Sequence, residues 1–383
     1  MNLKDFFYKK VSYQFLWADE NTYSLFGGAL RLKASSRGCQ DLRLLGLRLF
    51  KKQLKGHNMI SKVFCLPFYK ENLMRKFLDS LLPMIDEKYD GIYIIRHNIG
   101  ESYIYLAHLK DWVKANGTKK PLLIVWQEKY IPFYKMFLPK NVSIKYISIN
   151  KNCIQDALDN EQILYNGRRI FCPTPSIAEN INRIYDTDKS ANFYDYICKD
   201  FGRNNKLSMQ CPKIDKITKL RMSKKISDFL KRPFVILLPF ATSLSDMSDA
   251  FWNILIKEFN RIGYDVFINN GNDENSSVFT DVVSFDTNVA EIFTLAEESA
   301  GIIGLASGLS VLLTAAKRPM DLIYTDFRVF NPRISSERIK HLYSVHNLPG
   351  VSALVREYAA EDFTEMQLVQ EIISKYKKRA NRD

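Results

Sequence analysis

The chain has 383 residues, of which 46% are hydrophobic and 25% are charged. This balance is typical of a globular protein and excludes an intrinsically disordered one, and the length favours two domains with additions. No apolar run reaches the roughly 20 residues that span a bilayer. The N-terminus, MNLKDFFYKK, lacks the long apolar core of a secretory signal. We therefore expect a cytoplasmic protein.

The net charge of +13 is unevenly distributed. Residues 1–75 contain 14 Lys and Arg against 5 Asp and Glu. A basic surface of this kind favours an anionic partner, such as a phosphorylated substrate or the inner face of the cell membrane. A solvated lysine-rich face is the alternative. Short apolar runs broken by Gly and Pro predict small strands and turns in this basic N-terminal extension.

Cysteine and histidine give no indication of a metal site. The six cysteines form no C-x-x-C pair, and the five histidines form no H-E-x-x-H. The irregular cysteine spacing also argues against a disulfide framework. We expect no metal and no cofactor.

The stretch 76–215 alternates between strand and helix patterns. Apolar strands that alternate with helices indicate a parallel sheet covered on both faces. The predicted strands are 90–96, 121–126, 142–147 and 169–172, and the predicted helices are 102–115, 130–138 and 175–185. A polar stretch at 186–232 is the expected connection to the next domain, with a helix at its end.

The alternation restarts in the stretch 230–355. Its predicted strands are 234–238, 264–269, 301–304 and 320–324, and its predicted helices are 250–262, 288–299 and 308–316. A last helix, 364–379 within a C-terminal segment 360–383, is expected to fold back on the first lobe. The predicted fold class is therefore α/β, with two Rossmann-like lobes and a small basic N-terminal extension.

Three blocks of the second lobe carry a family pattern. They are Leu237-Leu-Pro-Phe-Ala-Thr-Ser243 with Phe251-Trp252, then Gly263-Tyr-Asp-Val-Phe-Ile-Asn-Asn-Gly-Asn-Asp-Glu274, then Val289–Ala296 with Gly304-Leu-Ala-Ser-Gly-Leu309 and Arg318-Pro319. In this order they resemble the heptosyltransferase-like glycosyltransferases (glycosyltransferase family 9, two-lobed GT-B fold). The resemblance covers residues 233–325 well and the first lobe weakly.

The resemblance implies a glycosyltransferase that moves a sugar from a nucleotide-sugar donor to a growing cell-surface glycan, such as a capsule or lipopolysaccharide. Transfer in this family is inverting and independent of metal. A donor diphosphate needs backbone N–H groups and helix N-termini, which loops at the carboxyl ends of parallel strands supply. The implied donor-binding residues are Thr242, Ser243, Asn270, Gly271, Glu274, Ser307, Gly308 and Leu309. For the last loop the alternative is an ordinary N-cap serine followed by a turn glycine.

In the first lobe, Ile94-Ile-Arg-His-Asn-Ile-Gly-Glu101 resembles the segment whose acidic residue is the family's proposed general base. Glu101 would take the proton of the acceptor hydroxyl, with His97 as the substitute. The alternative is a first-turn acid that the helix dipole stabilises. Arg96 and Arg328 are candidates for binding donor or acceptor phosphate, and structural ion pairs are the alternative.

The chain departs from the family at three places. Ala306 and Val311 stand where the family has Asp and His, and Ser245-Asp246 replaces an expected lysine. The donor is therefore not fixed as a heptose nucleotide. A fucosyl- or pyruvyl-type transferase on the same scaffold, or a non-catalytic polysaccharide-assembly subunit, stays open. The chain has no G-x-G-x-x-G, no P-loop and no named nucleic-acid module, so a dinucleotide oxidoreductase and a nucleic-acid partner are not expected.

Overall fold

In a computed structural model, the chain divides into two compact units. The first contains residues 1–90 and 148–174, and the second contains residues 91–147 and 175–383. The structure describes five strand backbones between residues 16 and 53, and then 75–380 except for 76, 96–97, 126, 149–162, 173–180, 182–184, 201–208, 210, 270–278 and 329–333. The domain boundaries expected from the sequence stay predictions.

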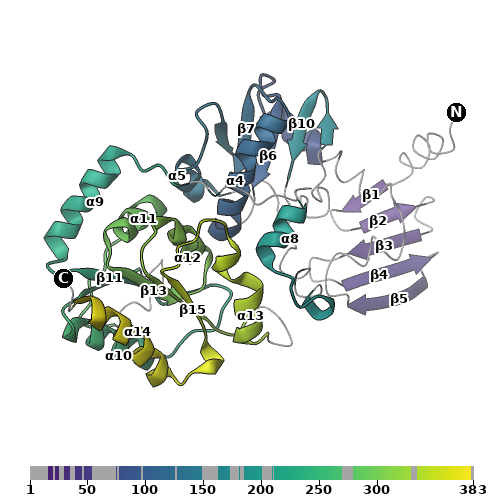
Figure 1. The fold of residues 1–383 in the computed structure, drawn as a ribbon. Coiled ribbons are helices and arrows are strands. Elements are labelled where there is room, and N and C mark those ends of the chain that lie inside the picture. Colours follow the sequence, from purple (N-terminus) through teal and green to yellow (C-terminus); the bar gives the residue numbers. More distant parts are fainter. Residues whose placement is uncertain are drawn as a thin grey trace. The chain divides into compact units, whose positions relative to one another are not determined.

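The first unit contains an antiparallel meander. Its strands β1 (Leu16–Asp19), β2 (Thr22–Leu25), β3 (Leu30–Ala34), β4 (Cys39–Leu44) and β5 (Leu47–Gln53) pair in chain order (Figure 1). The expected small strands of the basic extension are confirmed for this part. Another short apolar run of the extension, at 63–70, lies outside the described residues.

The first unit also contains a tight hairpin and the short helix η3 (Leu82–Met84). Strands β9 (Ile163–Tyr165) and β10 (Arg168–Phe171) are antiparallel and joined by Asn166-Gly167, which have φ values of 48° and 74°. Two positive φ angles in a two-residue loop match the twist of the strands, and Asn-Gly is the preferred pair for such a turn. The sequence predicts one strand here, and the structure contains two.

The second unit begins with a parallel arrangement of β6 (Gly91–Ile95), β7 (Pro121–Val125) and β8 (Ser143–Tyr146). Helix α4 (Ile99–Ala115) follows β6, and η4 (Glu128–Tyr130) and α5 (Ile131–Lys135) follow β7. Every residue of β6 and β7 is buried, as expected for parallel strands covered on both faces.

A second parallel sheet follows in the same unit. Its order is β12 (Asp265–Ile268), β11 (Phe234–Leu238), β13 (Gly301–Leu305), β14 (Met320–Tyr324) and β15 (Val355–Ala359). Because β11 comes first in the chain but lies between β12 and β13, the strand order reverses there. Ligands of open α/β sheets bind in the crevice at such a point, at the carboxyl ends of the strands. The predicted α/β class with two parallel sheets is confirmed.

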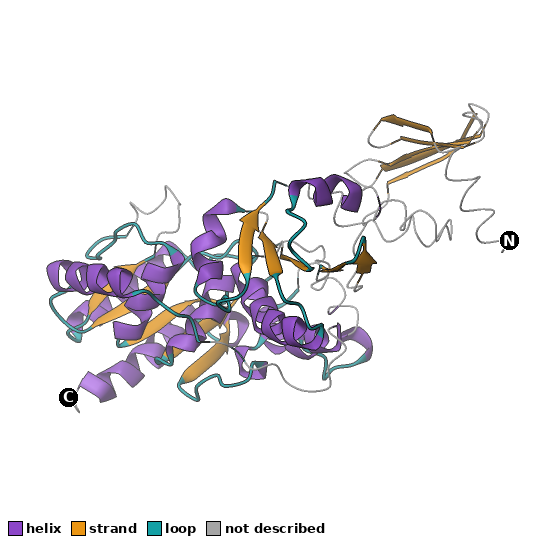
Figure 2. Cartoon of the chain, turned by 90° about the horizontal axis from the view of Figure 1, so that it is seen from above, coloured by secondary structure: helices purple, strands orange, loops and turns teal. Residues whose placement is uncertain are grey.

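Helices cover both faces of this second sheet (Figure 2). The helices in this part of the chain are α9 (Lys216–Phe229), which packs on α11, and α10 (Asp249–Arg261), α11 (Val289–Glu298), α12 (Gly308–Leu313) with η6 (Thr314–Ala316), α13 (Ser336–Tyr343) with η7 (Val345–Asn347), η8 (Ala360–Asp362) and α14 (Glu365–Ala380). A further helix, α8 (Phe193–Asp200), comes before them in the chain. The sequence predicts neither α8, nor α13, nor β15.

Helix α14 packs on the second sheet. Its Leu368, Ile372 and Tyr376 share one core with Trp252 of α10 and Leu237 of β11. The prediction that this helix returns to the first lobe is therefore wrong. Its apolar residues recur every three to four positions and form one stripe, and this stripe closes the core of the neighbouring sheet.

A polar network under β14 and β15 fixes the same helix. Asp321 is fully buried and forms an ion pair with Arg356, and it accepts hydrogen bonds from Tyr358 (2.8 Å) and Tyr376 (3.3 Å). A buried carboxylate persists only when it is paired in this way.

Among the described residues, no helix is both long and apolar enough to cross a membrane.

Candidate active site

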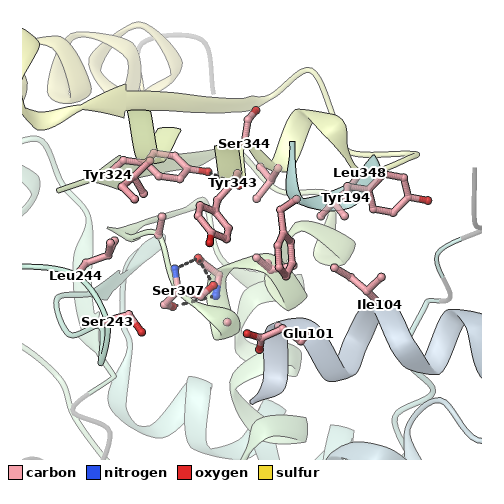
Figure 3. A pocket seen from close by; sticks show the side chains of 18 of the residues that line it. Glu101, Ile104, Tyr194, Ser243, Leu244, Ser307, Tyr324, Tyr343, Ser344 and Leu348 are labelled. Carbon is pink, nitrogen blue, oxygen red and sulfur yellow. Dashed lines mark hydrogen bonds between the residues drawn. The ribbon is translucent and has the colours of Figure 1, made fainter. Parts of the chain in front are cut away.

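A cavity lies at the crevice where the order of the second sheet reverses (Figure 3). The loops after β11, β13 and β14 line it, together with the first turns of α4 and the end of α13. Its volume is about 160 Å³, and one water needs about 10–15 Å³ in the same measure. The cavity therefore has room for a ligand of the size of a monosaccharide.

Most of the wall is apolar or aromatic. The apolar side chains that line the cavity are Ile104, Phe193, Leu244, Ala306, Val311, Phe327, Ile339, Val345 and Leu348. No lysine or arginine is among the described lining residues, and Glu101 is the one carboxylate. The described part of the cavity thus fits a neutral ligand group better than a phosphate.

Hydrogen bonds tie the loop after β11 to the loop after β14. The Ser245 N–H donates to the Asp326 carbonyl (2.8 Å), and the Arg328 N–H donates to the Ser243 carbonyl (2.9 Å). The Thr325 hydroxyl donates to the Ser245 carbonyl (2.5 Å). Because these bonds run in both directions between the loops, Ser243 is held at the cavity rim by backbone geometry.

The turn after β13 is a capping box. The Ser307 side chain accepts from the Ser310 N–H (3.3 Å), and the Ser310 hydroxyl lies 2.7 Å from the Ser307 N–H. The ordinary N-cap interpretation of Ser307 therefore applies. It does not remove the residue from the site, because Ser307 lines the cavity and its own O–H is still a donor.

Gly308 has a packing role. A Cβ on Gly308 would lie 2.7 Å from the Gly100 nitrogen, and a Cβ on Gly100 would lie 2.8 Å from the Gly308 Cα. Real Cβ atoms do not approach backbone so closely, so both positions need glycine. This contact brings the first turns of α4 and α12 together and places Glu101 beside the Ser307 turn.

Glu101 is half-buried in the first turn of α4 and reaches towards the Ser307 turn (Figure 3). Burial raises the pKa of its carboxyl group above the ordinary value, and its own backbone N–H opposes this by a smaller amount. The helix dipole favours a charged acid at this position, whereas burial favours the neutral form. A glutamate with a raised pKa suits proton transfer near neutral pH.

Tyr343, at the end of α13, is a cavity residue that the sequence does not predict. Its hydroxyl is buried and has no hydrogen-bond partner among the described residues. Burial, and then the charge of Glu101, raise its pKa. The helix that carries it has no family motif, so no local signal marks this tyrosine.

The cavity brings together Glu101, Ser243, Ser307 and Gly308. Thr242 is exposed and Leu309 is half-buried, and neither lines the cavity. Arg328 is exposed and forms an ion pair with Asp246 outside the lining, as the structural alternative predicts. The remaining predicted site residues lie outside the described part of the chain: Arg96, His97, Asn270, Gly271 and Glu274.

Two of the departures from the family pattern lie in the cavity wall. Ala306 and Val311 both line it. An acid and an imidazole at these positions would make this wall polar, whereas the methyl and isopropyl groups present leave it apolar. Within the described ranges, no group of three or more His, Cys, Asp or Glu side chains is arranged to hold a metal ion.

No family model and no curated protein matches the chain. Among solved structures it is similar to the ADP-heptose lipopolysaccharide heptosyltransferase II of E. coli, with 12% identity and a TM-score of 0.49, over 74% of this chain and 98% of that one. It is also similar to a glycosyl transferase of family 9 from Veillonella parvula (10% identity, TM-score 0.49, 74% and 96%). A wall teichoic acid polymerase is more distant (11%, TM-score 0.37, 85% and 89%).

Proposed function

We propose that the chain is a glycosyltransferase that moves a sugar from a nucleotide-sugar donor to a hydroxyl group of a growing cell-surface glycan. One observation carries the proposal. The carboxylate of Glu101 shares a cavity with the loops after β11 and β13, at the point where the order of the parallel sheet reverses. The family-like motifs at 237–243 and 304–309 supply these same two loops.

The chemistry requires one base and one leaving group. Glu101 takes the proton of the acceptor hydroxyl while the acceptor oxygen attacks the anomeric carbon of the donor. The bond from that carbon to the phosphate oxygen breaks, and the nucleoside diphosphate leaves with the electron pair. Attack on the face opposite the leaving group inverts the anomeric carbon, so we propose an inverting transferase.

No metal takes part in the proposed reaction. The negative charge of the leaving diphosphate is instead met by backbone N–H groups and by arginine. Arg96 is the candidate from the first lobe. Arg328 can serve only after it leaves its exposed pair with Asp246, and such a surface pair is worth about 0–1 kcal/mol.

The apolar wall formed by Ala306 and Val311 argues for a donor sugar other than heptose. The Asp and His of the resembled family are replaced at these positions by side chains that cannot form hydrogen bonds. A fucosyl- or pyruvyl-type donor and a non-catalytic subunit are the competing candidates. The acceptor is a glycan or lipid-linked acceptor at the cytoplasmic membrane face, where the basic residues 1–75 contact anionic lipid.

A sugar-nucleotide screen tests the proposal. Purified protein is incubated with UDP-, GDP-, CDP- and ADP-sugars, and melting temperature and release of nucleoside diphosphate are both measured. We expect one sugar nucleotide to raise the melting temperature and to release diphosphate faster when acceptor is added. Stabilisation without release would favour a non-catalytic subunit, and no stabilisation by any of them would contradict the proposed donor site.

A further inference from the structure

Tyr343 presents to the cavity a buried hydroxyl that has no hydrogen-bond partner in the part of the chain that the structure describes. Its ring lies near two other aromatic rings, with centroids 5.1 Å from Phe193 and 6.3 Å from Phe327. The hydroxyl end points into the cavity in Figure 3. A buried hydroxyl without a partner costs free energy, so its retention in a fixed place calls for a partner that arrives with a ligand.

The end of α13 is held by a second carboxylate, which fixes the position of this tyrosine. The side chain of Glu357 is 8% exposed, and it accepts from the Tyr324 hydroxyl (2.6 Å), the Ser344 hydroxyl (2.5 Å) and the Val345 N–H (2.7 Å). The Tyr324 hydroxyl also lies 3.2 Å from the Tyr343 carbonyl. The backbone at Tyr343 and the two residues after it is thus anchored, and the rings of Phe193 and Phe327 pack near its side chain.

The surroundings determine which atom of a ligand can bind there. Burial and the nearby charge of Glu101 raise the pKa of Tyr343, so the hydroxyl stays protonated at neutral pH. It can therefore donate to a neutral oxygen and also accept a hydrogen bond. The adjacent wall is apolar and contains no described lysine or arginine, which favours an uncharged ligand group over a phosphate.

We propose that Tyr343 is a substrate-binding residue that hydrogen-bonds a hydroxyl group of the donor sugar. The inference rests on the proposed function and goes beyond it by naming the group that recognises the sugar instead of the nucleotide. The donor sugar is favoured over the acceptor because the wall around Tyr343 comes from the second sheet. Tyr324, Leu244 and Phe327 lie in it, on or after strands of that sheet.

The test compares two ligands on one variant. Binding of the preferred sugar nucleotide and of its free nucleoside diphosphate is measured by calorimetry on the full chain and on Tyr343→Phe. We expect the variant to bind the sugar nucleotide about tenfold more weakly, the loss of one hydrogen bond, and the free diphosphate as well as wild type. Its ligand-free melting temperature should not fall, because no described residue is a hydrogen-bond partner of the lost hydroxyl. Tyr146→Phe, on β8 outside the cavity lining, is the matched control.

Several outcomes overturn the inference. They are unchanged affinity for the sugar nucleotide, an equal loss for both ligands, or a lower melting temperature of ligand-free Tyr343→Phe, which would show a structural partner. If the wild type transfers sugar and Tyr343→Phe binds the sugar nucleotide as tightly as the wild type does, only the role of Tyr343 is contradicted. A wild type that binds a sugar nucleotide without transfer contradicts the proposed function, and the binding comparison still decides the role of Tyr343. A wild type that binds no sugar nucleotide contradicts both.

Discussion

Gly100 and Gly308 are in backbone contact, and this contact joins the first turns of α4 and α12. A Cβ on either glycine would come within 2.8 Å of the other residue's backbone. Glu101 follows one of these glycines and Ser307 precedes the other. The packing of two helices thus sets the distance between the proposed base and the loop after β13.

Substitution of Gly308 by alanine tests this contact. Because the new methyl group meets backbone atoms that cannot rotate away, Gly308→Ala should destabilise the chain by about 1–3 kcal/mol, as measured by urea unfolding. The double variant with Gly100→Ala should cost less than the two single changes together, because one outward shift of α12 accommodates both methyl groups. Strict additivity would show that the two glycines are not in contact.

Substitution of Glu101 by glutamine tests the proposed base. The amide keeps the size of the side chain but cannot take a proton, so Glu101→Gln should lower kcat by about 10²–10⁴. Stabilisation by the sugar nucleotide should persist, since the substitution removes chemistry and not the cavity. Glu128→Gln, on η4 outside the cavity lining, is the control and should act like wild type. Full turnover by Glu101→Gln would exclude this residue as the base.

The pH dependence of stability gives a second test of Glu101. Its pKa is raised in the folded state, so the folded chain binds the proton more tightly than the unfolded chain. The residue therefore lowers the free energy of unfolding as pH rises from its unfolded pKa through its folded pKa, and this cost disappears on acidification. Glu101→Gln should be more stable than wild type at pH 8, and the difference should shrink towards pH 4. Urea unfolding at a series of pH values measures it, and a constant difference would contradict burial of the charge.

Substitution of Glu357 should lower the free energy of unfolding more than substitution of an exposed acidic residue near the second sheet. Its carboxylate accepts from three donors within 2.7 Å, and an amide at that place would present N–H groups to some of them. We expect Glu357→Gln to destabilise the chain by about 2–4 kcal/mol in chemical unfolding. Asp362→Asn breaks an exposed pair with Lys340 and is the control, with an expected change within about 1 kcal/mol. Similar effects of both variants would argue against the anchoring role.

Local pattern determined much of the framework. The buried strands β6, β7, β11, β13 and β14 are continuous apolar runs, which parallel strands covered on both faces require. The loops after them are where ligands of such sheets bind, and for this reason Glu101, Ser243 and Ser307 can be selected from sequence. The hairpin around Asn166-Gly167 also carries a local signal, which predicts its turn once the flanking strands are recognised.

Only the tertiary structure shows which residues that are distant in the sequence come into contact. The role of Gly308 depends on Gly100, which lies some two hundred positions earlier in the chain, and no local pattern records that contact. Tyr343 reaches the cavity because Phe193, Phe327 and Glu357 fix it there, each from a different part of the chain. The apolar stripe of α14 predicts that the helix packs, but only the assembled core shows on which sheet it does so. Periodicity thus records which side of an element is buried, and the partner that buries it is a property of the whole fold.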